Sequence, residues 1–124
     1  MTEGRCVLVV DDDHGMVDTL SDILVLNGWD AVRAYDGAEG VVCSSERDVN
    51  AVVMDVKMPR LNGVQALRAI KGRAPALPVI LITAVADDEL LAEANREGAL
   101  AILRKPIDPD VLLGMLDGAV RKSA

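Results

Sequence analysis

The sequence predicts an α/β fold, a doubly wound five-stranded parallel sheet with helices on both faces, and two observations lead to this prediction. Short apolar runs without polar alternation recur along the 124 residues, at 6–10, 31–34, 51–54, 79–82 and 101–103. Runs of this kind are typical of strands covered on both faces. Segments with helical spacing lie between these runs. Alternation of strand and helix repeated five times indicates parallel strands joined by right-handed crossovers.

The helical segments are marked by apolar residues three or four positions apart and by residues that favour helix ends. The clearest stripes lie at 16–27, 64–70, 90–94 and 111–120. Gly28 is expected to end the first of these helices, because glycine readily adopts the conformation common at helix C-termini. Asp108 and Pro109 are expected to begin the last helix as its cap and its first helical residue.

Size and charge narrow the function classes. A chain of 124 residues fits one domain with one core, so we expect a single domain over residues 1–124 with no output domain. Thirteen basic against twenty acidic residues leave a net charge of −7, which argues against nucleic acid as a partner. No apolar run reaches the roughly 20 residues that a membrane helix needs. The start of the chain does not resemble a signal peptide, so we expect a cytoplasmic protein with no membrane contact.

Charged or hydroxyl side chains follow four of the five predicted strands directly. Asp11 and Asp12 follow the first strand, Asp55 the third, Thr83 the fourth and Lys105 the fifth. In an open parallel sheet, ligands bind outside the carboxyl ends of the strands. If the first and third strands are neighbours, three carboxylates converge and repel one another unless a cation enters. Oxygen-only ligands suit Mg²⁺, and a carboxylate with a hydroxyl and an ammonium group beside it suits phosphoryl transfer.

These residues lie in motifs that resemble the receiver domain of bacterial two-component response regulators, including the single-domain chemotaxis regulator. The resemblance covers essentially the whole chain. The motifs are Val-Leu-Val-Val-Asp-Asp at 7–12, Met-Asp-Val-Lys-Met-Pro at 54–59, Asn-Gly at 62–63, Ile-Thr-Ala at 82–84 and Lys-Pro at 105–106. The resemblance implies a flavodoxin-like sheet with strand order 2-1-3-4-5.

The resemblance also implies a role for each site residue. Asp55 would be the phosphoacceptor, and Asp11 and Asp12 would hold Mg²⁺ together with Asp55 and the backbone carbonyl of Lys57. Thr83 and Lys105 would bind the phosphoryl oxygens. The family also tends to have a cis peptide bond before the proline at position 106.

The implied function is a signalling switch rather than an enzyme, apart from catalysis of its own phosphorylation and dephosphorylation. The phosphoryl donor would be a phosphohistidine of a sensor histidine kinase or a phosphotransfer protein. The domain would pass the signal to a downstream protein or an output domain. A homodimer through the fourth helix, fifth strand and fifth helix is possible, again by resemblance.

Some residues have an ordinary structural interpretation or depart from the family pattern. Asp13 is expected to cap the first helix, and His14 is expected to lie at the start of that helix rather than to bind metal or donate phosphoryl groups. Ile102 and Ile107 stand where many members have aromatic residues. The usual aromatic rotation cannot occur at Ile102, so a shift of Thr83 and the following loop is the expected alternative.

Two other functions remain open from the sequence. A degenerate receiver would act only as a protein-binding module, although the intact set of site residues speaks against it. A phosphatase of the haloacid dehalogenase type uses similar Mg²⁺ chemistry. That class carries an Asp-x-Asp-Thr pattern, whereas residues 11–14 read Asp-Asp-Asp-His.

Overall fold

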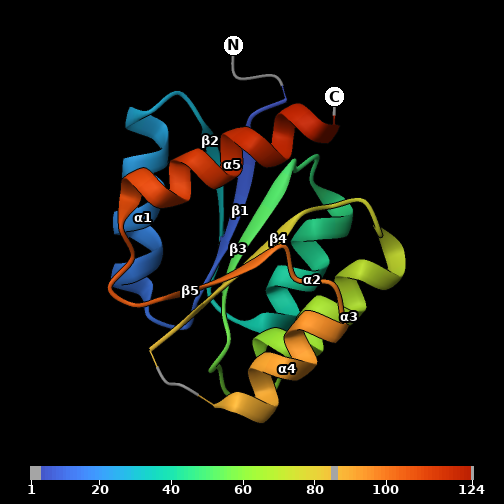
Figure 1. Cartoon of the computed structure of the whole chain (residues 1–124). Helices are drawn as coiled ribbons and strands as arrows, with labels where there is room; N and C mark the ends of the chain where they lie inside the picture. The colour runs from blue at the N-terminus through green and yellow to red at the C-terminus, as the bar shows by residue number, and fades with distance from the viewer. Residues whose placement is uncertain (1–3, 85–86, 124) are drawn as a thin grey trace.

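A five-stranded parallel sheet forms the centre of the molecule (Figure 1). The computed structural model describes residues 4–84 and 87–123. The described strands are β1 (Cys6–Val10), β2 (Asp30–Ala34), β3 (Ala51–Asp55), β4 (Val79–Thr83) and β5 (Ala101–Arg104). Their order is β2-β1-β3-β4-β5, and every neighbouring pair is parallel. The predicted fold class and strand order are therefore confirmed.

Five helices alternate with the strands and cover both faces of the sheet. They are α1 (His14–Leu26), α2 (Gly37–Glu46), α3 (Gly63–Arg73), α4 (Asp88–Arg96) and α5 (Pro109–Ser123). Helices α1 and α5 lie on one face, and α2, α3 and α4 lie on the other (Figure 1). Among the described residues, no helix is both long and apolar enough to cross a membrane.

Each face of the sheet has its own apolar core because successive strand residues point to opposite sides. Val7, Val9 and Val53 pack with α1 and α5, whereas Leu8 and Val52 pack with α2, α3 and α4. All the residues of β3 and β4 are buried. This explains why their sequences are apolar up to the last residue of each strand, Asp55 and Thr83, instead of alternating.

The helix ends follow the predicted capping chemistry. The Asp13 side chain accepts a hydrogen bond from the backbone N–H of Met16 and so caps α1. Gly28 follows the C-terminal end of α1 with a φ of 86°, a conformation that glycine adopts without strain. The Asp108 side chain accepts a hydrogen bond from the Asp110 N–H at the start of α5.

Helix α2 had no apolar stripe in the sequence, and its packing shows why. Its fully buried residues are Gly37, which lies against Leu61, and Gly40, whose close approach to β1 depends on the lack of a side chain. A Cβ atom on Gly40 would lie 2.9 Å from a methyl carbon of Val10, which is too close for van der Waals packing. The helix therefore approaches β1 through its backbone.

Gly63 brings the first turn of α3 against the end of β3. A Cβ atom there would lie 2.8 Å from the Cα of Val56 and would also overlap the carbonyl oxygen of Asp55. The Gly63 N–H donates a hydrogen bond to the Val56 carbonyl at 2.8 Å. Asn62 caps the same helix in a reciprocal pair with Gln65. The loop after Asp55 is thus held at both ends.

We predict that Gly63→Ala lowers the free energy of unfolding by about 2–3 kcal/mol, because the new methyl group meets backbone atoms that cannot move aside cheaply. Gly72→Ala in the same helix is the matched control. Its Cβ meets no atom within 4 Å, so that change should raise the free energy of unfolding by about 0.5–1 kcal/mol. Urea denaturation of both variants measures the difference, and equal stabilities would contradict the close approach.

Candidate functional site

The strand register places the predicted site residues at one edge of the sheet. Val10 pairs with Met54, so Asp11 and Asp55 follow these partners at the ends of neighbouring strands. Asp55 pairs with Ile82 on β4, and Thr83 is the next residue of that strand. Thr83 pairs with Arg104 on β5, and Lys105 follows it. Four site residues scattered over the sequence are thereby gathered at the carboxyl end of the sheet.

Three carboxylates meet at this edge. Asp11, Asp12 and Asp55 each offer one oxygen atom, and these three atoms all lie within 4.8 Å of one another. Asp11 and Asp55 are 1% and 5% exposed, whereas Asp12 is exposed to solvent. The cluster is therefore open on one side and closed by the sheet on the other. This geometry suits a cation that keeps part of its water shell.

Lys105 is the positive charge that faces these carboxylates. Its ammonium nitrogen lies 3.0 Å from Oδ2 of Asp11 and 3.5 Å from Oδ2 of Asp55. Burial by itself lowers the pKa of Lys105, but the hydrogen bond with Asp11 and the charges of Asp55 and Asp11 outweigh burial and raise that pKa. Lys105 is thus held in its charged form within reach of both buried carboxylates. The peptide bond between Lys105 and Pro106 is cis, as the resemblance implied.

Asp55 has a perturbed protonation equilibrium. Burial, followed by the negative charge of Asp11, raises the pKa of Asp55 from 3.8 to about 6, although Lys105 acts in the opposite direction. One ammonium group therefore does not neutralise the cluster fully. Negative charge at Asp55 is costly unless a further cation approaches.

Thr83 and Lys57 border the cluster. Thr83 ends β4 and is 1% exposed, and its carbonyl accepts a hydrogen bond from the Lys105 N–H at 2.8 Å. Lys57 lies in the exposed loop two residues after Asp55. Its side chain is not paired with the cluster but with Asp87, at 3.6 Å. Nothing in the spacing of Lys57 and Asp87 along the sequence signals their contact, so this ion pair was not predictable from the sequence.

The residues with an ordinary structural interpretation lie outside the cluster. Asp13 caps α1, and His14 is the first residue of that helix, as predicted. The His14 ring packs against the Tyr35 ring with centroids 4.1 Å apart. Ile102 is half-buried and packs against the core under α4. Residues 85 and 86, in the loop expected to shift with Thr83, lie outside the described residues.

The arrangement combines a buried carboxylate that could act as a nucleophile, oxygen atoms that could bind a hard cation, and an ammonium group. These groups have the charges needed to hold and stabilise a phosphoryl group during transfer. They converge at strand ends, where ligands of open parallel sheets bind.

Comparison with known proteins agrees with this chemistry. The family model of the response regulator receiver domain matches residues 7–117. The chain is 34% identical over 118 residues to the transcriptional regulatory protein GlrR of Escherichia coli strain K12. The aligned residues make up 95% of this chain and 27% of GlrR. It is 32% identical over 124 residues to the transcriptional regulatory protein FixJ of Bradyrhizobium diazoefficiens, covering 99% of the chain and 60% of FixJ. The chain thus spans only part of these regulators.

Solved structures agree as well. A CheY-like receiver domain protein from Methanospirillum hungatei superposes with a TM-score of 0.92 at 26% identity, over 95% of this chain and 94% of that one. The beryllofluoride-activated NtrC4 receiver domain, a dimer, superposes with a TM-score of 0.87 at 30% identity over the full length of both chains. Receiver domains are signalling modules of two-component systems and are generally not enzymes. The strand-end carboxylates, the fold and these matches together show that the chain belongs to the response regulator receiver domain family.

Proposed function

We propose that this receiver domain accepts a phosphoryl group on Asp55 from a phosphohistidine, in a reaction that requires Mg²⁺. The observation that carries the proposal is the meeting of Asp11, Asp12 and Asp55 within 4.8 Å beside the Lys105 ammonium group. The donor would be a sensor histidine kinase or a histidine phosphotransfer protein. The signal would pass to a downstream protein or an output domain. Residues 1–124 would act as one receiver domain.

The residues present fit Mg²⁺. The donor set consists of oxygen atoms alone, and its charge is only partly balanced by Lys105. Asp11, Asp12, Asp55 and the backbone carbonyl of Lys57 would hold the ion, with water completing its shell. When bound, the ion supplies positive charge to the carboxylate and phosphoryl oxygens.

In the transfer, the phosphohistidine comes from the donor protein, and the domain supplies Asp55, Lys105 and Thr83. A carboxylate oxygen of Asp55 attacks the phosphorus atom, and the bond from phosphorus to the donor imidazole nitrogen breaks. The electron pair of that bond stays on the imidazole nitrogen, which takes up a proton from water. Lys105 and the Thr83 hydroxyl would bind the phosphoryl oxygens, and these contacts favour the bound phosphoryl group. The same site would later admit water and release phosphate, so the domain would catalyse its own phosphorylation and dephosphorylation.

Two other functions suit the site less well. A degenerate receiver that only binds proteins would not require the three carboxylates and Lys105 to stay together in the fold. A phosphatase for small esters needs a cavity that encloses its substrate, whereas Asp12 is exposed at the edge of the sheet.

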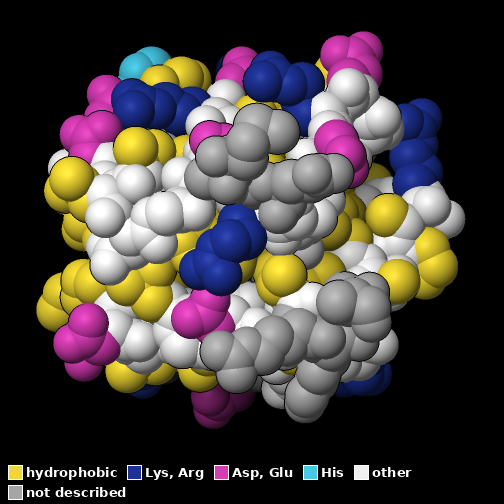
Figure 2. Space-filling model, turned by 90° about the horizontal axis from the view of Figure 1, so that it is seen from above, with side chains coloured by type: hydrophobic (Ala, Val, Ile, Leu, Met, Phe, Trp, Pro, Cys, Tyr) yellow, Lys and Arg dark blue, Asp and Glu magenta, His cyan; other side chains and the backbone are white. Residues whose placement is uncertain are grey.

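The surface charge supports protein partners rather than nucleic acid for this domain. In Figure 2, which looks down on the molecule of Figure 1 from above, basic side chains lie scattered among acidic and apolar ones. The net charge of −7 also disfavours contact with phosphate backbones. We propose a cytoplasmic protein without membrane contact, whose DNA-binding output, if it has one, resides outside these residues.

The phosphoacceptor proposal is tested by intact mass after incubation with acetyl phosphate. We expect the wild-type chain to gain one phosphoryl group with Mg²⁺ present, and the Asp55→Ala variant to gain none. The same incubation without Mg²⁺ is the control for metal dependence. No gain in the wild type under either condition would contradict the proposal and favour a binding module.

We predict that Asp55 destabilises the metal-free protein above its folded-state pKa. The folded pKa of about 6 exceeds the unfolded value of 3.8, so the folded state binds the proton more tightly. The free energy of unfolding therefore falls as the pH rises between these values. At neutral pH, Asp55→Asn should raise this free energy by about 1–3 kcal/mol, and the gain should disappear below about pH 4.

Denaturation at a series of pH values measures this gain, and Asp88→Asn, which removes an exposed carboxylate, is the control. Mg²⁺ should stabilise the wild type more than Asp55→Asn, because ion binding requires the charged cluster. If Asp55→Asn raised the free energy of unfolding equally in acid, repulsion between charged carboxylates would not be the cause of the gain.

We propose that a homodimer forms through α4, β5 and α5. Leu100 and Val111 are about half exposed on this side of the molecule, and Leu100, Ala101 and Met115 line a groove there. The related NtrC4 receiver is a dimer when activated. Sedimentation before and after phosphorylation should show a shift towards dimer, and Leu100→Lys should reduce that shift. A monomer in both states would exclude the dimer.

A further inference from the structure

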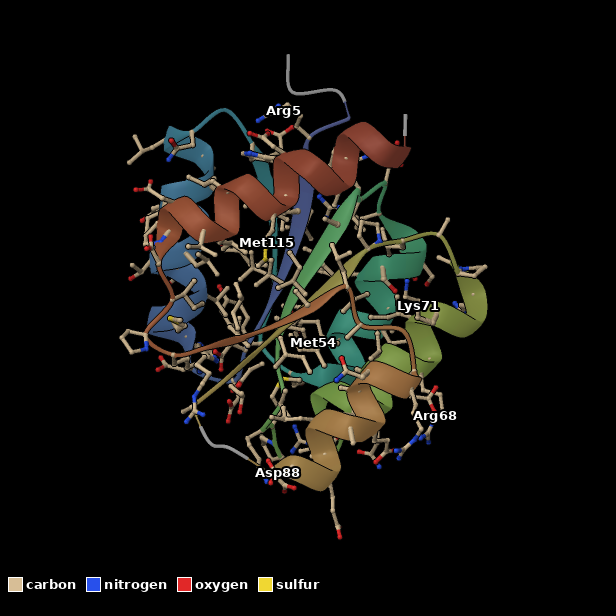
Figure 3. All side chains as sticks on the ribbon, viewed as in Figure 1. Arg5, Met54, Arg68, Lys71, Asp88 and Met115 are labelled. Carbon is tan, nitrogen blue, oxygen red and sulfur yellow. The ribbon has the colours of Figure 1, made fainter. Side chains whose placement is uncertain are left out.

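Helix α4 is held to the rest of the domain largely by charged side chains. Ala94 is its one fully buried residue, and Leu90 packs against the core only in part. Near the C-terminal end of the helix, the Arg68 guanidinium donates hydrogen bonds to Glu93 at 2.6 Å and to Glu97 at 3.0 Å. Figure 3 shows Arg68 beside α4. An element with little buried apolar surface can shift at low cost.

The N-terminal end of α4 is held by a different ion pair. Asp87 caps the helix, since its Oδ1 atom accepts a hydrogen bond from the Leu90 N–H at 3.1 Å. Its other oxygen, Oδ2, lies 3.6 Å from the ammonium nitrogen of Lys57. Lys57 lies two residues after Asp55, in the loop that follows β3. One side-chain contact therefore joins the phosphoacceptor loop to the start of α4.

We propose that the Lys57–Asp87 ion pair is a latch that holds the start of α4 in the unphosphorylated domain and opens when Asp55 is phosphorylated. The proposal rests on the proposed function, because phosphorylation of Asp55 is the event that opens the latch. Phosphorylation adds negative charge and further acceptor oxygens next to the Lys57 loop. The Lys57 ammonium then moves from Asp87 to the phosphoryl group, and Asp87 is released.

The ion pair has the strength that a reversible latch needs. The side chains of Lys57 and Asp87 are 52% and 40% exposed, so water and salt screen their attraction. A more highly charged competitor placed close by is sufficient to displace one carboxylate from such a pair. A buried ion pair at this position would resist the exchange.

The two attachments of α4 determine how the helix moves. Arg68 pairs with Glu93 in the second half of the helix and with Glu97 at its C-cap, and nothing in the exchange at Lys57 disturbs these pairs. Release of Asp87 therefore frees the first turn while the second half stays in place, so that α4 pivots about Arg68. This mechanism needs no aromatic residue at position 102, where the chain has a half-buried isoleucine.

The test compares Asp87→Asn with Asp88→Asn. Asparagine still caps a helix, so Asp87→Asn removes the ion pair and keeps the cap. Asp88→Asn removes the same charge from the next residue, which has no ion pair within the described part of the chain; Figure 3 labels Asp88 at the start of α4. Backbone amide chemical shifts of Leu91, Ala92 and Ala94 report the position of the helix, whereas the Leu90 amide donates to the altered side chain and is left out. Binding of beryllofluoride with Mg²⁺ measures affinity for a stable phosphoryl mimic.

Without beryllofluoride, the Leu91 and Ala92 amides of Asp87→Asn should move towards their positions in the beryllofluoride-bound wild type, while the Ala94 amide moves less. Because coupling between two events is reciprocal, opening the latch should also increase the affinity for beryllofluoride, by roughly 1.5- to 5-fold. Asp88→Asn should resemble the wild type in both measurements. High salt should reduce the differences between wild type and Asp87→Asn.

The outcomes separate the latch from the proposed function. A wild-type chain that gains a phosphoryl group and binds beryllofluoride, with amide shifts and affinity unchanged in Asp87→Asn, would overturn the latch alone. Equal effects of Asp87→Asn and Asp88→Asn would also overturn it, because the helix dipole would then explain them. A wild-type chain that neither gains a phosphoryl group nor binds beryllofluoride would overturn the proposed function and the latch together.

Discussion

The mutual repulsion of Asp11, Asp12 and Asp55 is the constraint on which the rest of the site depends. The parallel register of β1 and β3 forces these carboxylates together, and burial strengthens their repulsion. Lys105, delivered from β5, offsets part of that charge. The negative charge that Lys105 does not balance favours binding of a cation. It also makes the site responsive to any change in charge. The same imbalance would underlie the proposed metal binding and the proposed switching, and together with burial it raises the pKa of Asp55.

Much of the fold was predictable because its signals are local. The apolar runs of β3 and β4 have no polar alternation, and both strands are fully buried. The capping residues Asp13 and Asp108 act within one turn of their helices. Helix α2 could not be located in the same way, since its fully buried residues are Gly37 and Gly40, whereas Val41 and Cys43 are buried only in part. Glycine leaves no periodic apolar pattern, and the need for it emerges only when Val10 is seen beneath the helix.

In the candidate site, too, some features were predictable from the sequence and others were not. Asp11, Asp55, Thr83 and Lys105 were predictable because each follows a strand, and parallel strands end at the same edge. The contact between Lys57 and Asp87 was not, because it joins two loops whose relative position depends on the whole sheet. Arg68 with Glu93 and Glu97 is a similar case. Contacts between side chains on separate elements require the assembled structure, and here those contacts hold the helix that the proposed switch would move.

The most direct test of the central claim is to locate the phosphoryl group chemically. After phosphorylation with acetyl phosphate and Mg²⁺, borohydride reduces an aspartyl-phosphate to homoserine, and peptide mass spectrometry identifies the altered position. The account predicts homoserine at position 55 alone. Homoserine at position 11 or 12, or no conversion in a chain that has gained phosphoryl mass, would contradict the assignment of Asp55 as the nucleophile of the carboxylate cluster.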